Sequence, residues 1–139
     1  MSGYLLDTNV LSELVRPRPE TRVVEWIEAA DEAMLYLSVL TLGEIRKGVA
    51  AVSHGKRRTR LETWLEVDLP ARFAGRIVPI DVHIADRWGV IAAEAKRKGE
   101  TLSVIDGLLA ATALHRNLTV VSRNVAHFPI AQVFNPWRM

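Results

Sequence analysis

The sequence predicts an α/β fold with a small, mostly parallel sheet of about five strands. Short apolar runs recur along the chain, and the segments between them carry apolar residues at steps of three and four. The first pattern is typical of buried strands and the second of amphipathic helices. Strands that alternate with helices favour parallel pairing, because each helix returns the chain to the side of the sheet where the next strand begins.

The first half of the chain alternates two expected strands with four expected helical segments. Residues 4–6 and 35–38 are short apolar runs, and each is predicted to form a buried strand. Apolar residues at helical spacing predict the helices, which cover residues 9–15, 21–30, 42–52 and 56–73. Pro17 and Pro19 separate the first two helices, since proline removes a backbone donor and disfavours helix in the residue before it.

The second half continues the alternation and adds the clearest amphipathic helix. Residues 77–80 are expected to form a strand that Pro79 keeps short, because proline donates no hydrogen bond to a neighbouring strand. The amphipathic helix covers residues 83–98 and is expected to stop at Gly99, which follows a basic last turn. The remaining expected elements are a helix over residues 104–116 and strands over residues 118–122 and 131–134.

The composition suits a single domain over residues 1–139 and excludes several classes of protein. Almost half of the residues, 49%, are hydrophobic, and cysteine is absent, which excludes disulfides and thiolate metal sites. There is no apolar run of about 18 residues that could span a membrane and no secretory signal, so we expect a cytoplasmic protein without membrane attachment. The formal net charge is only +2, so the positions of the charges matter more than their sum.

Three carboxylates stand at the starts of expected helices, and each has a local explanation. Asp7 is an ordinary N-cap residue. The stretch from Thr41 to Glu44 matches a capping box, and the stretch from Ser103 to Asp106 closely resembles one. Taken one at a time, the three carboxylates are best interpreted as helix caps.

Taken together, the three carboxylates indicate a metal site. Asp7 and Glu44 each follow a strand closely, and Asp106 begins a helix that leads into the strand at 118–122, so one edge of the sheet could gather all three. Two carboxylates ~5 Å apart repel by roughly 3 kcal/mol, at an effective dielectric constant near 20. The dipole at a helix N-terminus stabilises a nearby carboxylate by only about 0.3–1 kcal/mol, so the repulsion is larger. The cluster should therefore take up protons or bind a divalent cation that prefers oxygen ligands, Mg²⁺ or Mn²⁺.

These carboxylates lie in segments that closely resemble the PIN-domain ribonucleases, in particular the VapC-type toxins of bacterial toxin–antitoxin pairs. The segments are, in chain order, LLDTNVLSE, LTLGEIRKGV, SVIDGLLAATAL and TVVSRN, and the ending VFNPW is similar to the FitB branch. The resemblance covers nearly the whole chain. It implies a three-layer α/β/α sandwich around a small parallel sheet, with an acidic pocket that holds Mg²⁺ or Mn²⁺.

The resemblance also implies roles for individual residues. Asp7, Glu44 and Asp106 correspond to the catalytic metal ligands of the family. Asn124 falls where the family often has a fourth acidic residue, and it is expected to join the catalytic set by orienting a water or the hydration shell of the metal. This difference removes one negative charge, which leaves open whether one metal ion or two are bound. The residues expected to form hydrogen bonds behind the ligands are Thr8, Asn9 and Ser122.

The implied reaction is endonucleolytic cleavage of RNA. A bound cation polarises a phosphodiester oxygen and lowers the pKa of a water that attacks phosphorus, and Asp106 is our choice for the group that accepts the proton. An acidic pocket needs cations around it to hold RNA phosphates. The residues expected to do so are Arg46, Lys47 and Arg123. His127 is the one histidine whose position suggests a part in the site, with a surface or capping role as the alternative.

The resemblance further implies two protein partners. One is a second copy of the chain, which would make a homodimer. The other is a cognate antitoxin, a small DNA-binding protein whose C-terminal segment wraps the toxin and blocks its pocket. Through that antitoxin, the chain could join a hetero-oligomer on operator DNA.

Three alternative functions compete with the toxin ribonuclease. A haloacid-dehalogenase-type phosphatase also begins with an apolar strand that ends in aspartate, but it needs a second aspartate where this chain has Asn9. A non-catalytic binding module with the PIN fold would lack one of the three core carboxylates, and all three are present. A DNA nuclease or structure-selective nuclease on the same fold stays open.

Overall fold

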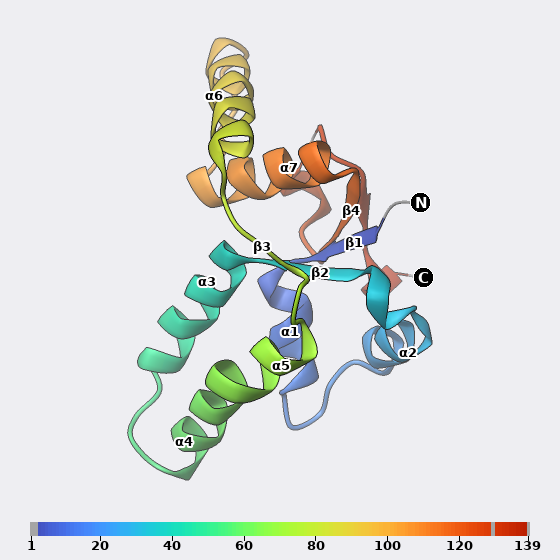
Figure 1. Ribbon diagram of the computed structural model, residues 1–139, viewed down its shortest axis with the longest axis vertical. Helices are drawn as coiled ribbons and strands as arrows, with labels where there is room; N and C mark the ends of the chain where they lie inside the picture. Colours follow the sequence, from blue (N-terminus) through green and yellow to red (C-terminus); the bar gives the residue numbers. More distant parts are fainter. Residues whose placement is uncertain (1–2, 129, 139) are drawn as a thin grey trace.

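A parallel sheet of five strands, in the order β3-β2-β1-β4-β5, lies at the centre of the molecule. The structure is a computed structural model that describes residues 3–128 and 130–138 (Figure 1). The strands are β1 (Gly3–Leu6), β2 (Leu35–Ser38), β3 (Ile77–Val78), β4 (Leu118–Val121) and β5 (Val133–Phe134). Within these described ranges every strand pair is parallel. The predicted α/β fold is confirmed.

The register of β1 with β4 places the first polar residues of the chain. Leu6 pairs with Val121 at the carboxyl ends of the two strands, so Asp7 and Ser122 follow at the same edge of the sheet. The backbone N–H of Asp7 extends this ladder by donating to the Val121 carbonyl at 2.9 Å. The end of the central strand is therefore fixed by main-chain bonds before any side chain contributes.

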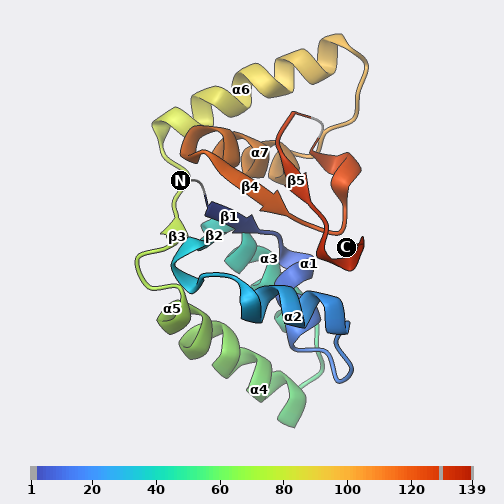
Figure 2. The same ribbon diagram turned by 90° about the vertical axis from the view of Figure 1, so that its right-hand side faces the viewer.

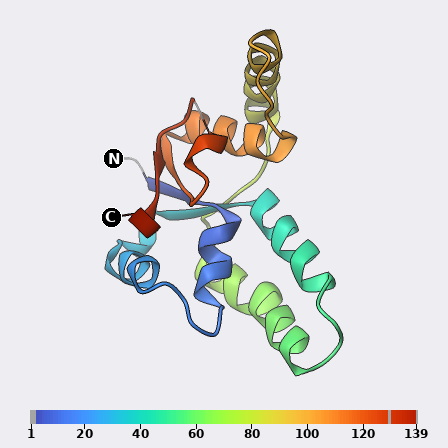
Figure 3. The ribbon, with the colours of Figure 1, turned by 180° about the vertical axis from the view of Figure 1, so that it is seen from behind.

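One face of the sheet is covered by the helices of the first half of the chain. These are α1 (Thr8–Leu14), α2 (Thr21–Ala29), α3 (Val39–Ala50), and a helical run made of α4 (Lys56–Thr63), η2 (Trp64–Asp68) and α5 (Leu69–Arg72). Figure 3 shows α1 between α2 and α3 on this side. Their apolar sides bury Leu11, Val23 and Phe73 completely, together with Leu6 and Leu37 of the sheet.

The other face is covered by α7 (Val104–Arg116), and α6 (Val82–Arg97) packs on α7 (Figures 1 and 2). Leu109 and Ala110 of α7 pack with Val120 of the sheet, while Ile84 and Ile91 of α6 pack with α7 and β3. Helices therefore lie on both faces of the sheet. The three-layer α/β/α sandwich implied by the resemblance is confirmed.

The structure corrects several expected boundaries. The helix expected over 42–52 begins at Val39, because Ser38 caps it by accepting a hydrogen bond from the Leu40 N–H at 3.0 Å. The helix expected over 56–73 contains a π-helical segment, Trp64–Asp68, which widens the turn just before Pro70, whose ring would clash with a carbonyl one regular turn earlier.

Other elements differ from expectation at their ends. The strand at 77–80 stops before Pro79, and the last two strands are shorter than 118–122 and 131–134. The sequence did not predict three short 3₁₀ turns, η1 (Glu32–Met34), η3 (Val125–His127) and η4 (Pro136–Arg138). Across the described residues, no helix is both long and apolar enough to cross a membrane.

The contact between β1 and the turn before β2 gives a test of this packing. A Cβ added at Gly3 would lie 2.6 Å from the Met34 carbonyl oxygen and 2.9 Å from the Tyr36 ring. We expect Gly3→Ala to lower the free energy of unfolding by about 1–3 kcal/mol, as overpacking does. Gly89→Ala in α6, where a Cβ meets nothing within 4 Å, should raise it by about 0.5–1 kcal/mol. Urea denaturation measures both, and equal stability of the two variants would contradict the close approach at Gly3.

Candidate active site

Asp7 lies at the end of the central strand and is almost fully buried, with 8% of its surface exposed. Its Oδ1 accepts the Thr8 N–H at 2.8 Å, which makes it the N-cap of α1. Its Oδ2 accepts the hydroxyl of Ser122 at 2.8 Å. The carboxylate therefore does two things at once: it caps a helix and joins the ends of two neighbouring strands.

Glu44 reaches the same place from α3. Because Ser38 caps that helix, Thr41 and Glu44 lie inside it, and the predicted capping box at this position is wrong. The Glu44 side chain instead accepts the Thr8 hydroxyl at 2.7 Å through Oε1. Thr8 therefore links the two carboxylates, because its backbone N–H donates to Asp7 and its hydroxyl donates to Glu44.

Asp106 belongs to the first turn of α7, on the opposite face of the sheet. The local cap is present, since the Ser103 hydroxyl oxygen accepts the Asp106 N–H at 3.1 Å. The carboxylate itself lies next to His127 of η3, with 3.3 Å between Oδ2 and Nδ1. His127, the one histidine that the sequence suggested for the site, therefore lies beside Asp106.

Ser122 organises the polar groups behind Asp7. Besides donating to Asp7, its hydroxyl oxygen accepts the Asn9 amide at 3.2 Å and the backbone N–H of Asn124 at 3.0 Å. The side-chain oxygen Oδ1 of Asn9 accepts the backbone N–H of Arg123 at 3.3 Å. Thr8, Asn9 and Ser122 thus form hydrogen bonds around the acidic residues, while Asn124 lines an adjoining polar cleft.

The electrostatics connect the three carboxylates. Burial raises the pKa of Asp7 above its ordinary value, hydrogen bonds from Ser122 and Thr8 lower it, and the charges of Glu44 and Asp106 raise it further. Hydrogen bonds that favour the charged form do not fully offset the cost of removing the carboxylate from water. The charges of Glu44 and Asp106, from two distant segments, therefore act on Asp7 at the end of β1.

The donor chemistry of this cluster suits a hard divalent cation. Carboxylate oxygens are the ligands that Mg²⁺ and Mn²⁺ prefer, and a cation would relieve the unfavourable charge that burial and neighbouring carboxylates impose on Asp7. In the part of the chain that the structure describes, no three histidine, cysteine or acidic side chains are arranged closely enough to hold a metal as they stand. Glu44 and Asp106 are turned toward Thr8 and His127, so side-chain rotation would have to complete the site.

The three basic residues expected around the pocket have different surroundings. Arg46 forms an ion pair with Glu66, with 2.8 Å between Nη2 and Oε1, which directs it toward η2. Lys47 is exposed in the last turn of α3. The Arg123 guanidinium stands 5.5 Å from the centre of the Trp137 ring. Arg123 is therefore supported by the C-terminal turn, a contact that the sequence did not indicate.

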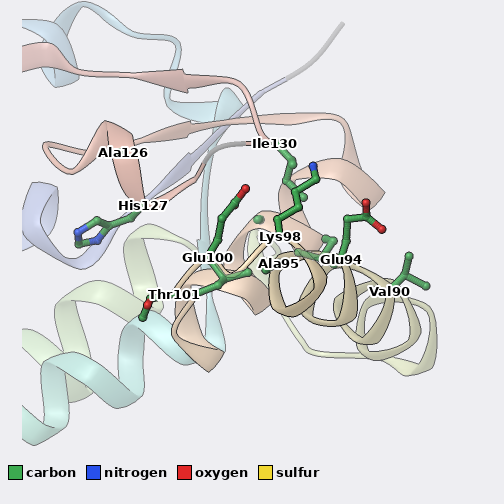
Figure 4. Close-up of a pocket in the computed structure, with 12 residues that line it drawn as sticks. Val90, Glu94, Ala95, Lys98, Glu100, Thr101, Ala126, His127 and Ile130 are labelled. Carbon is green, nitrogen blue, oxygen red and sulfur yellow. The ribbon is translucent and has the colours of Figure 1, made fainter.

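An apolar hollow of about 590 Å³ is lined in part by His127. Figure 4 shows its lining, which comes from the second half of α6, the loop that follows it, one residue of α7 and the η3 region. Val90 of α6 lines it and is 64% exposed, and Ile130 lines it from the opposite side and is 47% exposed. The hollow adjoins the acidic site through His127, which lies beside Asp106.

The fold and the acidic site together define the class of this protein. Residues 4–129 match the PIN domain, and the chain belongs to the PIN-domain family. Within that family it falls among the VapC- and FitB-type toxins.

Two curated relatives illustrate that grouping. The chain is 43% identical to Toxin FitB of Neisseria gonorrhoeae over 135 residues, which is 96% of this chain and 97% of that protein. It is 38% identical to the VapC ribonuclease Y4jK of Sinorhizobium fredii, over 96% of each. A solved structure of FitAB bound to an IR36 DNA fragment superposes with a TM-score of 0.92 at 40% identity, over 98% of this chain and 96% of that one.

The raised pKa of Asp7 makes a prediction about stability and pH. The folded chain holds the Asp7 proton to higher pH than the unfolded chain, in which the ordinary value is 3.8. The contribution of Asp7 to stability is therefore present at low pH and is lost as the pH rises through the folded-state pKa. Asp7→Asn has no proton to lose there, so the free energy of unfolding of the variant should rise relative to that of the wild type as the pH increases from the ordinary value of 3.8 through the folded-state pKa.

Denaturation with EDTA present measures this difference and removes any contribution from bound cations. A difference between variant and wild type that does not change over this range would contradict the burial and crowding of Asp7.

Proposed function

We propose that this chain is a metal-dependent endoribonuclease that acts as the toxin of a toxin–antitoxin pair in the cytoplasm. The observation that carries the proposal is the buried Asp7, whose pKa is raised by burial and by the charges of Glu44 and Asp106. The similarity to FitB and to a VapC ribonuclease over nearly the full chain supports the same activity.

In this proposal Asp7, Glu44 and Asp106 hold Mg²⁺ or Mn²⁺. When bound, such a cation polarises a phosphodiester oxygen and makes a water molecule more acidic. Ser122 and Thr8 keep Asp7 and Glu44 in place through their hydroxyl groups.

Asp106 accepts the proton of the attacking water, and the neighbouring His127 orients its carboxylate. Asn124, which lines the adjoining cleft, orients a water molecule beside the acidic residues.

Replacement of Asp7 by asparagine tests the catalytic role separately from the capping role. Asn caps a helix about as well as Asp, so the fold should persist. Cleavage of RNA should fall by more than about a hundredfold, since even residues behind metal ligands cost about 10- to 100-fold when replaced. Gel assays with tRNA, mRNA and single-stranded DNA, each with Mg²⁺ or EDTA, measure the loss and distinguish an RNA nuclease from a DNA nuclease.

Asp86→Asn, an exposed change on α6, is the matched control and should cleave as the wild type does. Mg²⁺ should also raise the melting temperature of the wild type more than that of Asp7→Asn, because a ligand stabilises the form that binds it. Full activity of Asp7→Asn with metal present would refute the assignment.

We also propose an antitoxin partner and a homodimer. FitAB has been solved as a complex on DNA, and the same kind of assembly would bring this chain to operator DNA through its antitoxin. The apolar hollow beside His127 is a suitable surface for an antitoxin segment, because a chain lying there would also obstruct access to Asp106.

The hollow gives a matched pair of variants on one helix. Val90 lines the hollow, whereas Val82 at the start of α6 is 80% exposed and does not line it. If the small protein encoded by the neighbouring reading frame is the antitoxin, co-expression should yield a complex that does not cleave RNA. Val90→Glu should weaken that complex and restore cleavage, because it places a charge in an apolar contact, and Val82→Glu should not. Size-exclusion chromatography and the cleavage assay measure both effects.

A further inference from the structure

A polar cleft of about 680 Å³ lies beside the acidic site, between the C-terminal turn and the start of α2. In Figure 2 the C-terminal turn η4 lies next to α2, against which it packs. Arg22 lines the cleft from α2, Arg123 from the segment after β4, and Arg138 from η4. The start of α2 and two segments near the C-terminus thus bring three arginines to one hollow.

The cleft is connected to Asp7 through short hydrogen bonds. Asn124, which lines the cleft, donates its backbone N–H to the Ser122 hydroxyl at 3.0 Å, and Ser122 donates to Asp7 at 2.8 Å. A strand with one phosphate at the acidic site would therefore have its neighbouring phosphates at or near this cleft.

The charge of the cleft suits an anionic strand. The lining carries three arginines and one glutamate, Glu20, which leaves a formal excess of two positive charges. The Glu20 carboxylate accepts a hydrogen bond from the Nε–H of Arg22 at 2.7 Å. The same guanidinium has further N–H donors in a planar fork that suits phosphate. The backbone N–H of Glu20 donates to the buried Glu13 at 2.8 Å, so the start of α2 is held against α1.

The opposite wall is equally constrained. The Arg123 guanidinium lies 5.5 Å from the Trp137 ring centre, and the Arg123 carbonyl accepts the Asn135 amide at 3.5 Å. The side-chain oxygen of Asn135 in turn accepts the backbone N–H of Trp137 at 2.9 Å. The guanidinium groups of Arg22 and Arg123 therefore have contacts that limit their motion, which reduces the entropy lost when a strand binds.

We propose that this cleft binds the sugar–phosphate backbone of a single RNA strand next to the phosphate that is cleaved, with Arg22 and Arg138 as phosphate contacts. The proposal rests on the function proposed above and adds to it the path of the strand. It assigns phosphate contacts to two residues, Arg22 in α2 and Arg138 in the C-terminal turn, that lie outside the three motifs carrying the acidic residues.

The test measures binding of a fluorescein-labelled single-stranded RNA of 12 nucleotides to Asp7→Asn, which retains the cleft and is not expected to cut the probe. Fluorescence anisotropy over a range of salt concentrations gives the affinity and its salt dependence. Adding Arg22→Ala and Arg138→Ala together should weaken binding roughly tenfold and reduce the slope of log K against log salt by about 1.4, or about 0.7 for each phosphate that an arginine no longer neutralises.

Arg97→Ala is the matched control, because Arg97 is an exposed arginine on α6 that pairs with Glu94. It should change neither the affinity nor the slope. Thermal melting of each variant confirms that the proteins compared are folded. An unchanged salt slope in the folded double variant would overturn the proposal.

Two further outcomes separate this inference from its alternatives. If the wild type cleaves no RNA but the arginine-dependent binding is present, the proposed function fails and the strand path stands. If labelled poly-glutamate loses affinity in the double variant while RNA does not, the cleft binds an acidic protein segment and the proposal is wrong.

Discussion

The burial of the Asp7 carboxylate at the end of the central strand is the constraint on which the rest of the site depends. The parallel register of β1 and β4 brings Ser122 next to it, and burial alone would favour its neutral form. The Ser122 hydroxyl and the Thr8 N–H stabilise the charge, while Glu44 and Asp106 work against it. The balance leaves a carboxylate that gains from a nearby cation, and a cation is what the proposed chemistry requires.

The same edge of the sheet divides into an acidic part and a cationic part. The acidic part is made by residues at the end of β1 and near the starts of α3 and α7. The cationic part is built by the C-terminal turn, which supports Arg123 through Trp137. An RNA strand needs both, since its scissile phosphate must approach carboxylates while its other phosphates need positive charge.

Local patterns predicted the helices and strands well. Apolar runs and helical spacing are properties of neighbouring residues, and they located the strands and helices to within a few positions. They failed where two local solutions were equally good: Thr41 and Ser38 are both suitable caps for α3, and Ser38 is chosen because β2 ends there and the helix follows at once. That choice places Glu44 one turn inside the helix, where it reaches Thr8.

The sequence by itself determined which side chains carry charge, which elements hold them, and that a strand ends at Asp7. The tertiary structure decided their partners: His127 beside Asp106, Arg46 with Glu66, and Trp137 beside Arg123. These contacts join residues from separate elements, and their distances are set by strand register and by the packing of helices on both faces of the sheet. Because that packing is a property of the whole core, no local pattern contains it.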